Sequence, residues 1–124
     1  MTSLSIVTVV YNAAETVGQC LASVQSQTHP VEHIVIDGGS TDGTMTVVEP
    51  HRSRLGALVS ERDRGIYDAM NKGIALATGE FVGILNADDF YSHPRVLENV
   101  AQALSSKALD SCYGDLVYVD PNKT

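Results

Sequence analysis

The chain of 124 residues has no long apolar run, few basic residues and only two cysteines. A membrane-spanning helix needs about 20 mostly apolar residues in succession, which excludes such a helix here. The first residues also lack the basic start and the apolar stretch of a signal peptide. We therefore expect a cytoplasmic protein that forms one domain over residues 1–124.

The shortage of basic residues excludes one large class of partners. Eight Lys and Arg stand against 15 Asp and Glu, giving a net charge of -7, whereas a nucleic-acid surface needs clustered positive charge. An anionic ligand would need a metal ion, helix N-termini or local Arg and Lys to offset the negative charge. Cys20 and Cys112 form no CxxC pattern and are expected to be reduced, half-buried thiols. The four histidines show no ligand spacing and are expected in loops or at the surface.

Short apolar runs alternate with segments of helical spacing along the chain. Strands are expected at residues 4–10, 33–37, 57–61, 80–85 and 111–120, and helices at 11–27, 45–51, 65–79 and 94–106. Asn12 is expected to cap the first helix, with Glu15 three residues later. This alternation predicts an α/β fold with a doubly wound, mostly parallel sheet and helices on both faces.

Polar and acidic residues follow each of the first four expected strands. Ligands of open α/β sheets bind outside the carboxyl ends of the strands, so these residues should meet at one edge. The segments are Val9-Val10-Tyr11-Asn12, the loop from Asp37 to Gly43, the loop from Glu61 to Gly65, and Asn86-Ala87-Asp88-Asp89. Their convergence predicts a ligand site at this edge of the sheet.

The glycine-rich loop GGSTDG, residues 38–43, matches neither GxGxxG nor a Walker phosphate loop. Its glycines and Ser40 are also typical of an ordinary strand-to-helix turn. Asp37, at the end of a buried strand, is expected to point its carboxylate into the cleft and accept a hydrogen bond from a nucleobase or a ribose.

Asp88 and Asp89 form an acidic pair directly after an apolar strand. Mg²⁺ and Mn²⁺ prefer oxygen ligands and often take only one or two carboxylates, together with phosphate oxygens. The alternative is that one aspartate only caps the following turn. The position at a strand end, opposite Asp37 and Tyr11, favours a site for a divalent metal, Mg²⁺ or Mn²⁺, against a diphosphate. Arg62 and Arg64 could contact a phosphate, but are expected to be exposed charges.

Several stretches together resemble the family 2 glycosyltransferases, which have the Rossmann-like GT-A fold. They are SIVTVVYN, VIDGGSTDGT, SERDRGIYDAMNKGIALATGEFVGILNADD and YGD, they occur in the family's order, and they cover nearly the whole chain. The version of these motifs in this chain, with DGGSTDGT and GIYDAMNKGI, is similar to that of bacterial enzymes of cell-surface polysaccharide biosynthesis. The resemblance implies transfer of a sugar from a nucleotide-diphosphate sugar, a UDP-sugar by preference, to an acceptor hydroxyl, with inversion and with a divalent metal.

The resemblance also implies roles for individual positions. Asp89 would bind the metal, and Asp88 would hold the ribose or bridge to the metal. Asn86 stands where an acidic residue is frequent, and Val9 where a proline is usual. The positions that correspond to nucleotide-binding residues are Val9, Tyr11, Asp37, Asp68, Asn71, Lys72 and Asp88.

The resemblance also implies that the GT-A domain is truncated in this sequence, because the family's general base lies on the second half of the domain. That base is expected beyond residue 124, and Asp115 is the only local candidate. An alternative hypothesis is therefore a catalytically incomplete fragment that binds a nucleotide-sugar. A third hypothesis is a phospho-receiver-like domain. Such a domain places its acidic pair after the first strand, where this chain has Tyr11-Asn12. An apolar edge at residues 116–119 favours a homo-oligomer. A lipid-linked glycan acceptor would place the enzyme at the inner face of the cell membrane.

Overall fold

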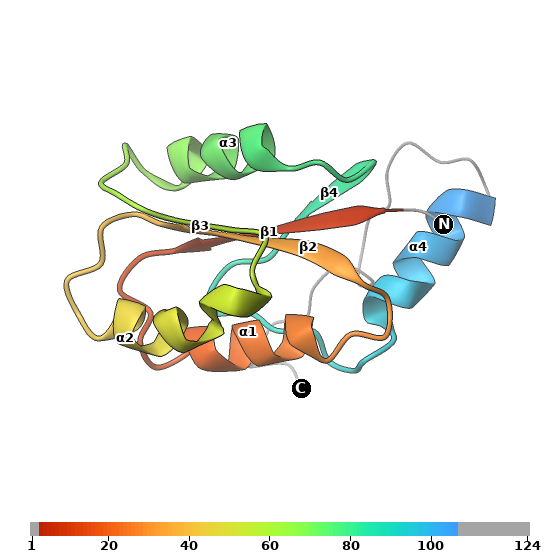
Figure 1. Ribbon diagram of the computed structural model, residues 1–124, viewed down its shortest axis with the longest axis horizontal. Coiled ribbons are helices and arrows are strands. Elements are labelled where there is room, and N and C mark those ends of the chain that lie inside the picture. Colours follow the sequence, from red (N-terminus) through yellow and green to blue (C-terminus); the bar gives the residue numbers. More distant parts are fainter. Residues whose placement is uncertain (1–2, 107–124) are drawn as a thin grey trace.

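The computed structural model describes residues 3–106, which form a parallel sheet of four strands between layers of helices (Figure 1). This architecture confirms the predicted doubly wound α/β fold with helices on both faces. The elements are β1 (Leu4–Val10), α1 (Val17–Gln25), β2 (Val31–Asp37), α2 (Thr44–Val48), the 3₁₀ helix η1 (Glu49–Arg54), β3 (Ala57–Ser60), α3 (Ile66–Leu76), β4 (Phe81–Ile84) and α4 (Val96–Ser106).

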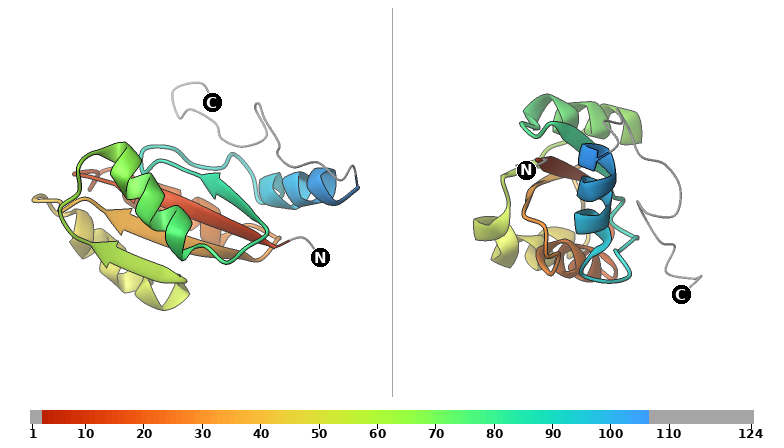
Figure 2. Two further views of the ribbon diagram at one scale, coloured as in Figure 1. Left: turned by 90° about the horizontal axis from the view of Figure 1, so that it is seen from above. Right: turned by 90° about the vertical axis from the view of Figure 1, so that its right-hand side faces the viewer.

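The strands lie in the order β3-β2-β1-β4, and every pairing is parallel. The chain first adds strands on one side of β1 and then crosses back to place β4 on the other side. Because crossovers are right-handed, this reversal puts α3 on the face of the sheet opposite to α1 and α2, as Figures 1 and 2 show. The reversal creates a topological switch point between β1 and β4, where ligands of such sheets bind.

Strand β1 is buried along its whole length and supplies apolar side chains to both faces. Val7 and Val9 belong to the cluster beneath α3, whereas Ile6 and Val10 belong to the clusters on the opposite face, which involve α1, α2 and α4. Alternate residues of a strand point to opposite faces, so a strand covered on both sides is apolar along most of its length. The run LSIVTVV is this pattern.

The first helix is shorter than predicted, and its predicted cap is wrong. Helix α1 begins at Val17 with Thr16 as N-cap, and no side chain makes a capping hydrogen bond. Asn12 lies in a separate loop with φ 48°, where its side chain bonds to the loop after β2 instead. The local sequence was compatible with a cap, but a partner 29 residues away satisfies the same oxygen.

The predicted second helix is divided into α2 and η1, with Pro50 in the first turn of η1. Proline has no N–H and cannot continue an α-helical hydrogen-bond ladder. The predicted strand at residues 111–120, Asp115 and the apolar edge at 116–119 lie outside the described residues. Within residues 3–106, none of the helices has the length and apolar character to cross a bilayer.

His33 is buried in β2, contrary to the expectation that the histidines lie in loops or at the surface. Its Nε2 lies 2.8 Å from the hydroxyl oxygen of Thr8 on the neighbouring strand, and its Nδ1 has no hydrogen-bond partner among the described residues. Burial, with a smaller contribution from the charge of His51, lowers the pKa of His33 to about 4. The neutral ring is therefore the form that the folded chain accepts.

This burial predicts that the free energy of unfolding falls as the pH drops from 6.5 towards 4. In that window the unfolded chain binds a proton at His33 that the folded chain does not bind. At pH 5 the loss is expected to be about 2 kcal/mol relative to pH 8. Urea unfolding of the wild type and of His33→Gln across this range measures it. An equally steep pH dependence in His33→Gln would assign the effect to other groups.

Candidate nucleotide and metal site

The loops that follow all four strands line one cleft of about 1080 Å³ at the carboxyl edge of the sheet. This volume suits a drug-sized or cofactor-sized ligand. The end of β1 and the loop after it contribute every residue from Val9 to Thr16. The other lining residues are Gly38, Gly39, Thr41, Asp42, Arg62, Asp63, Gly65, Ile66, Ala69, Asn86, Ala87 and Asp88.

The charge of the cleft is predominantly negative. Its acidic lining residues are Glu15, Asp42, Asp63 and Asp88, and Arg62 is the one basic residue among the described residues that line it. Arg62, which was expected to be an exposed charge, is both exposed and at the cleft. An anionic ligand that enters this cleft meets net repulsion unless a cation accompanies it.

The acidic turn, residues 86–89, is held at the end of β4 by backbone bonds to β1. The N–H of Leu85 donates to Val7 O at 2.9 Å, and that of Ala87 donates to Val9 O at 3.2 Å. The turn closes with a bond from Asp89 N to Asn86 O at 3.0 Å. The acidic turn therefore lies beside the carboxyl end of β1, at the switch point of the sheet.

The two carboxylates of the acidic turn differ in exposure. Asp88 is exposed and lines the cleft, whereas Asp89 is half-buried and is not among the lining residues. The Oδ1 atom of Asn86 is buried without a hydrogen-bond partner among the described residues. Within residues 3–106 no three His, Cys, Asp or Glu side chains are grouped as a metal cage. The oxygens of this turn suit a hard divalent ion that takes its remaining ligands from phosphate and water.

Cys20 lies beneath the acidic turn, where its thiol donates to Asn86 O across 3.7 Å. Burial, with smaller contributions from the charges of Asp89 and Asp88, raises the pKa of this thiol to about 12. Cys20 therefore stays a neutral thiol, fully buried rather than half-buried.

Tyr11 and Val9, for which the family resemblance implies contact with a nucleotide, both line the cleft. Tyr11 is 62% exposed although it is a large aromatic residue, so its ring is available to a ligand. Gly38 and Gly39 line the neighbouring part of the wall, and a Cβ on Gly38 would lie 2.7 Å from the Asp63 carboxylate.

The expectation that Asp37 points into the cleft is wrong, because its side chain is fully buried. One carboxylate oxygen accepts from Gly39 N at 3.1 Å, Ser40 N at 3.0 Å and the Ser60 hydroxyl at 2.8 Å. The other oxygen accepts from the Ser40 hydroxyl. Asp37 thus holds the glycine-rich loop from behind the cleft wall. The bond from Ser60 could not be predicted from the sequence, because Ser60 lies 23 residues from Asp37, whereas Ser40 lies only three residues away.

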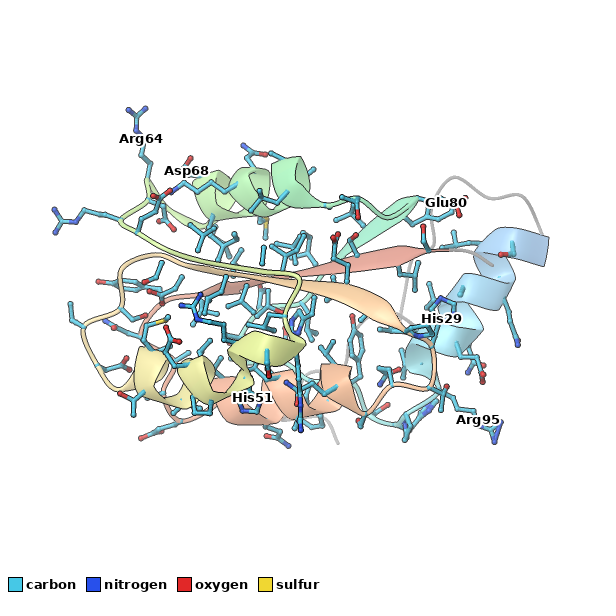
Figure 3. The ribbon with its side chains drawn as sticks, in the orientation of Figure 1. His29, His51, Arg64, Asp68, Glu80 and Arg95 are labelled. Atoms are coloured by element: carbon cyan, nitrogen blue, oxygen red, sulfur yellow. The ribbon has the colours of Figure 1, made fainter. Side chains whose placement is uncertain are left out.

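The polar side of α3 does not line the cleft. Asp68, Asn71 and Lys72, predicted near the nucleotide, are absent from the described lining residues. Lys72 Nζ lies 3.1 Å from a Glu61 carboxylate oxygen and 3.7 Å from one of Asp68. Asp68 also accepts from Arg64 N at 2.9 Å, and Figure 3 shows Arg64 and Asp68 beside α3 with the Arg64 side chain directed outwards. These contacts stabilise the start of α3.

Glu15, Asp42 and Asp63 are cleft residues that the sequence reasoning did not select. The Thr44 hydroxyl and backbone N–H groups bond to the Asp42 carboxylate and lower its pKa. Asp63 accepts from Gly65 N at 3.0 Å. Asp42 and Asp63 lie in two of the loops expected at the carboxyl edge of the sheet. The position of a loop alone does not predict which of its side chains line the cleft and which point outwards.

Comparisons with known proteins agree with this geometry. Residues 5–124 match the family model Glycosyl transferase family 2. The chain is 37% identical over 123 residues to a PGL/p-HBAD biosynthesis glycosyltransferase of Mycobacterium bovis, covering 95% of this chain and 48% of that protein. It is 32% identical to glycosyltransferase AglE of Haloferax volcanii, covering 96% of this chain and 41% of AglE. The chain therefore spans less than half the length of these relatives.

Solved structures show the same arrangement of strands and helices. S. aureus TarS 1–349 in complex with UDP-GlcNAc superimposes with a TM-score of 0.76 at 28% identity, over 84% of this chain and 31% of that one. The mannosyltransferase PcManGT from Pyrobaculum calidifontis, in complex with GDP-Man and Mn²⁺, gives a TM-score of 0.77 at 30% identity, over 84% of this chain and 32% of that one. The fold, the cleft and the family match lead to one assignment: this chain belongs to glycosyltransferase family 2.

Proposed function

We propose that residues 1–124 form the donor-binding part of a metal-dependent glycosyltransferase. The enzyme would move a sugar from a nucleotide-diphosphate sugar to an acceptor hydroxyl, with inversion, in polysaccharide biosynthesis. The observation that carries the proposal is the convergence of four strand-end loops on one acidic cleft, with the Asp88 carboxylate exposed within it.

The cleft suggests an orientation for the nucleotide. Tyr11, Gly38 and Gly39 offer an aromatic face and a wall without side chains, which suit a flat nucleoside. Asp88 lies on the other side of β1, next to β4, and suits the diphosphate end of the donor. Asp37 supports the glycine-rich loop rather than contacting the base, and Asp68, Asn71 and Lys72 lie outside the described lining of the cleft.

Asp88 and Asp89 are the residues that would hold Mg²⁺ or Mn²⁺. A divalent ion bound there would neutralise the diphosphate and stabilise it as a leaving group. Arg62 could add positive charge from the β3 side of the cleft. TarS was solved with UDP-GlcNAc, whereas PcManGT was solved with GDP-Man and Mn²⁺. Proteins with this fold therefore accept different nucleobases. For this chain we propose a UDP-sugar as donor.

The acceptor and the general base belong to the same proposal. A glycan or a lipid-linked glycan supplies the hydroxyl, at the cytoplasmic face of the membrane. The base removes its proton as the oxygen attacks the anomeric carbon. Asp115 lies outside the described residues, and the relatives extend well beyond the matched region. A nucleotide-sugar-binding fragment without turnover is therefore the second candidate, and it shares the same donor site.

Titration calorimetry with UDP, with and without Mn²⁺, tests the donor site. The wild type is expected to bind UDP at least about tenfold more tightly with Mn²⁺, because the ion offsets the acidic cleft. Asp89→Ala and Asp88→Ala are both expected to lose this dependence on Mn²⁺, and Asp88→Ala should not lower the metal-free affinity, because it removes a negative charge that repels the diphosphate.

Glu49→Ala is the matched control, because it removes an exposed carboxylate from η1 outside the cleft. Its UDP affinity should equal that of the wild type. Failure of the wild type to bind UDP, GDP or dTDP would contradict the proposed donor site. Hydrolysis or transfer of the sugar from a UDP-sugar would separate the enzyme from the binding fragment.

A further inference from the structure

Asn12 has an unusual backbone conformation. Its φ of 48° makes it the one non-glycine residue with positive φ within residues 3–106. The left-handed region is sparsely populated by residues with a side chain, although asparagine enters it more readily than most. Such a conformation persists only where surrounding contacts hold it, and it is often found at functional sites.

The side chain of Asn12 joins two loops of the cleft wall. Its Oδ1 accepts from the backbone N–H of Thr41 at 2.8 Å and from that of Asp42 at 3.3 Å. Its own backbone N–H donates to the Ser40 hydroxyl oxygen at 2.8 Å. Ser40 in turn donates to the buried carboxylate of Asp37. The Ser40 side chain, in the loop after β2, thus connects Asn12 to Asp37 at the end of β2.

The next two residues make the same kind of contact. Ala13 N donates to the Thr44 hydroxyl oxygen at 2.9 Å, and Ala14 N donates to Asp42 Oδ2 at 3.3 Å. Three consecutive backbone N–H groups of the loop after β1 therefore bond to side chains of the loop after β2 and of Thr44, the first residue of α2. In return, the backbone N–H groups of Thr41 and Asp42 donate to the side-chain oxygen of Asn12.

We propose that Asn12 is a positioning residue, which locks residues 11–16 to residues 38–43 and so holds Tyr11 in the cleft wall before a nucleotide binds. This inference rests on the proposed donor site. Tyr11 directly precedes Asn12, lines the cleft and is 62% exposed, so its place depends on the backbone that Asn12 holds. A site ordered in advance spares the ligand the entropy of ordering the loop.

Two substitutions separate the contributions of the side chain and of the backbone. Asn12→Gly keeps the positive φ but removes Oδ1, and Asn12→Ala removes both. If Oδ1 positions the loop, both variants should bind UDP with Mn²⁺ about tenfold more weakly, the effect of leaving roughly one more residue to be ordered on binding. Amide hydrogen exchange should show lost protection of Thr41 and Asp42 in both variants.

Gln27→Ala is the matched control. Gln27 also joins distant segments, because its Nε2 donates to His93 O at 2.9 Å and its Oε1 accepts from Leu97 N at 3.0 Å, outside the cleft. It should lower the melting temperature at least as much as the Asn12 variants while leaving UDP affinity unchanged. Wild-type affinity in Asn12→Gly, or equal weakening in Gln27→Ala, would overturn the inference.

The proposed function can fail separately. If the wild type itself does not bind UDP with Mn²⁺, the donor site is refuted, and the exchange data still decide whether Asn12 locks the loops. Unchanged protection of Thr41 and Asp42 in Asn12→Ala would then overturn the inference independently.

Discussion

Asp37→Ala is expected to lower the free energy of unfolding by about 3 kcal/mol and to weaken UDP binding at least about tenfold. The buried carboxylate accepts hydrogen bonds from Gly39 N, Ser40 N and the hydroxyls of Ser40 and Ser60. Alanine leaves these donors without their acceptor at a fully buried position. The expected loss in the free energy of unfolding is smaller than the summed contributions of these hydrogen bonds. Water can reach the donors of the loop, and the substitution also removes a buried charge. Urea unfolding and calorimetry measure the two effects.

Asp37→Asn separates support of the loop from direct contact with a base. The amide keeps one acceptor oxygen, so stability and UDP affinity should both fall, but less than in Asp37→Ala. Ser60→Ala removes one bond on the β3 side and should cost about 1 kcal/mol with little change in affinity. A variant Asp37→Asn with wild-type stability and no UDP binding would contradict the supporting role and favour direct contact.

Gly73→Ala is expected to lower the free energy of unfolding by about 2 to 3 kcal/mol. Gly73 faces β1 from the middle of α3, and a Cβ there would lie 2.3 Å from Val7 Cγ1 and 3.0 Å from Cγ2. Val7 is fully buried and β-branched, so it cannot rotate away without new clashes. Overpacking outweighs the gain of about 1 kcal/mol in helix propensity that alanine brings. Because Ile66 and Ala69 of α3 line the cleft, the shift of the helix should also weaken UDP binding.

Gly18→Ala provides the same substitution in a helix without the clash. A Cβ at Gly18 would lie 3.5 Å from Val47 Cγ1, an ordinary contact. This variant should be neutral or slightly stabilising by urea unfolding. The double variant Val7→Ala, Gly73→Ala should lose less free energy of unfolding than the sum of the two single variants, because the two changes are coupled through one contact. Additive losses in the double variant would show that Gly73 acts through something other than Val7.

The sheet and the location of the site were predictable from the sequence. The runs LSIVTVV and HIVID are too apolar and too β-branched for anything but strands covered on both faces. Alternation with helices then requires parallel strands, and parallel strands bring their carboxyl ends to one edge. Tyr11, Val9 and Asp88 were placed in the cleft by this argument alone. The family match follows the same stretches.

The direction of individual side chains was decided only by the tertiary structure. Asp37 ends β2 and Asp88 lies in the turn after β4, yet Asp37 is enclosed by hydroxyl and backbone donors while Asp88 is exposed. Asn12 resembles a helix cap locally, but its oxygen bonds to a loop 29 residues away. Lys72 pairs with Glu61 and Asp68 instead of lining the cleft. A strand end can turn its polar side chain inwards or outwards at similar local cost, so partners that are distant in sequence determine the outcome.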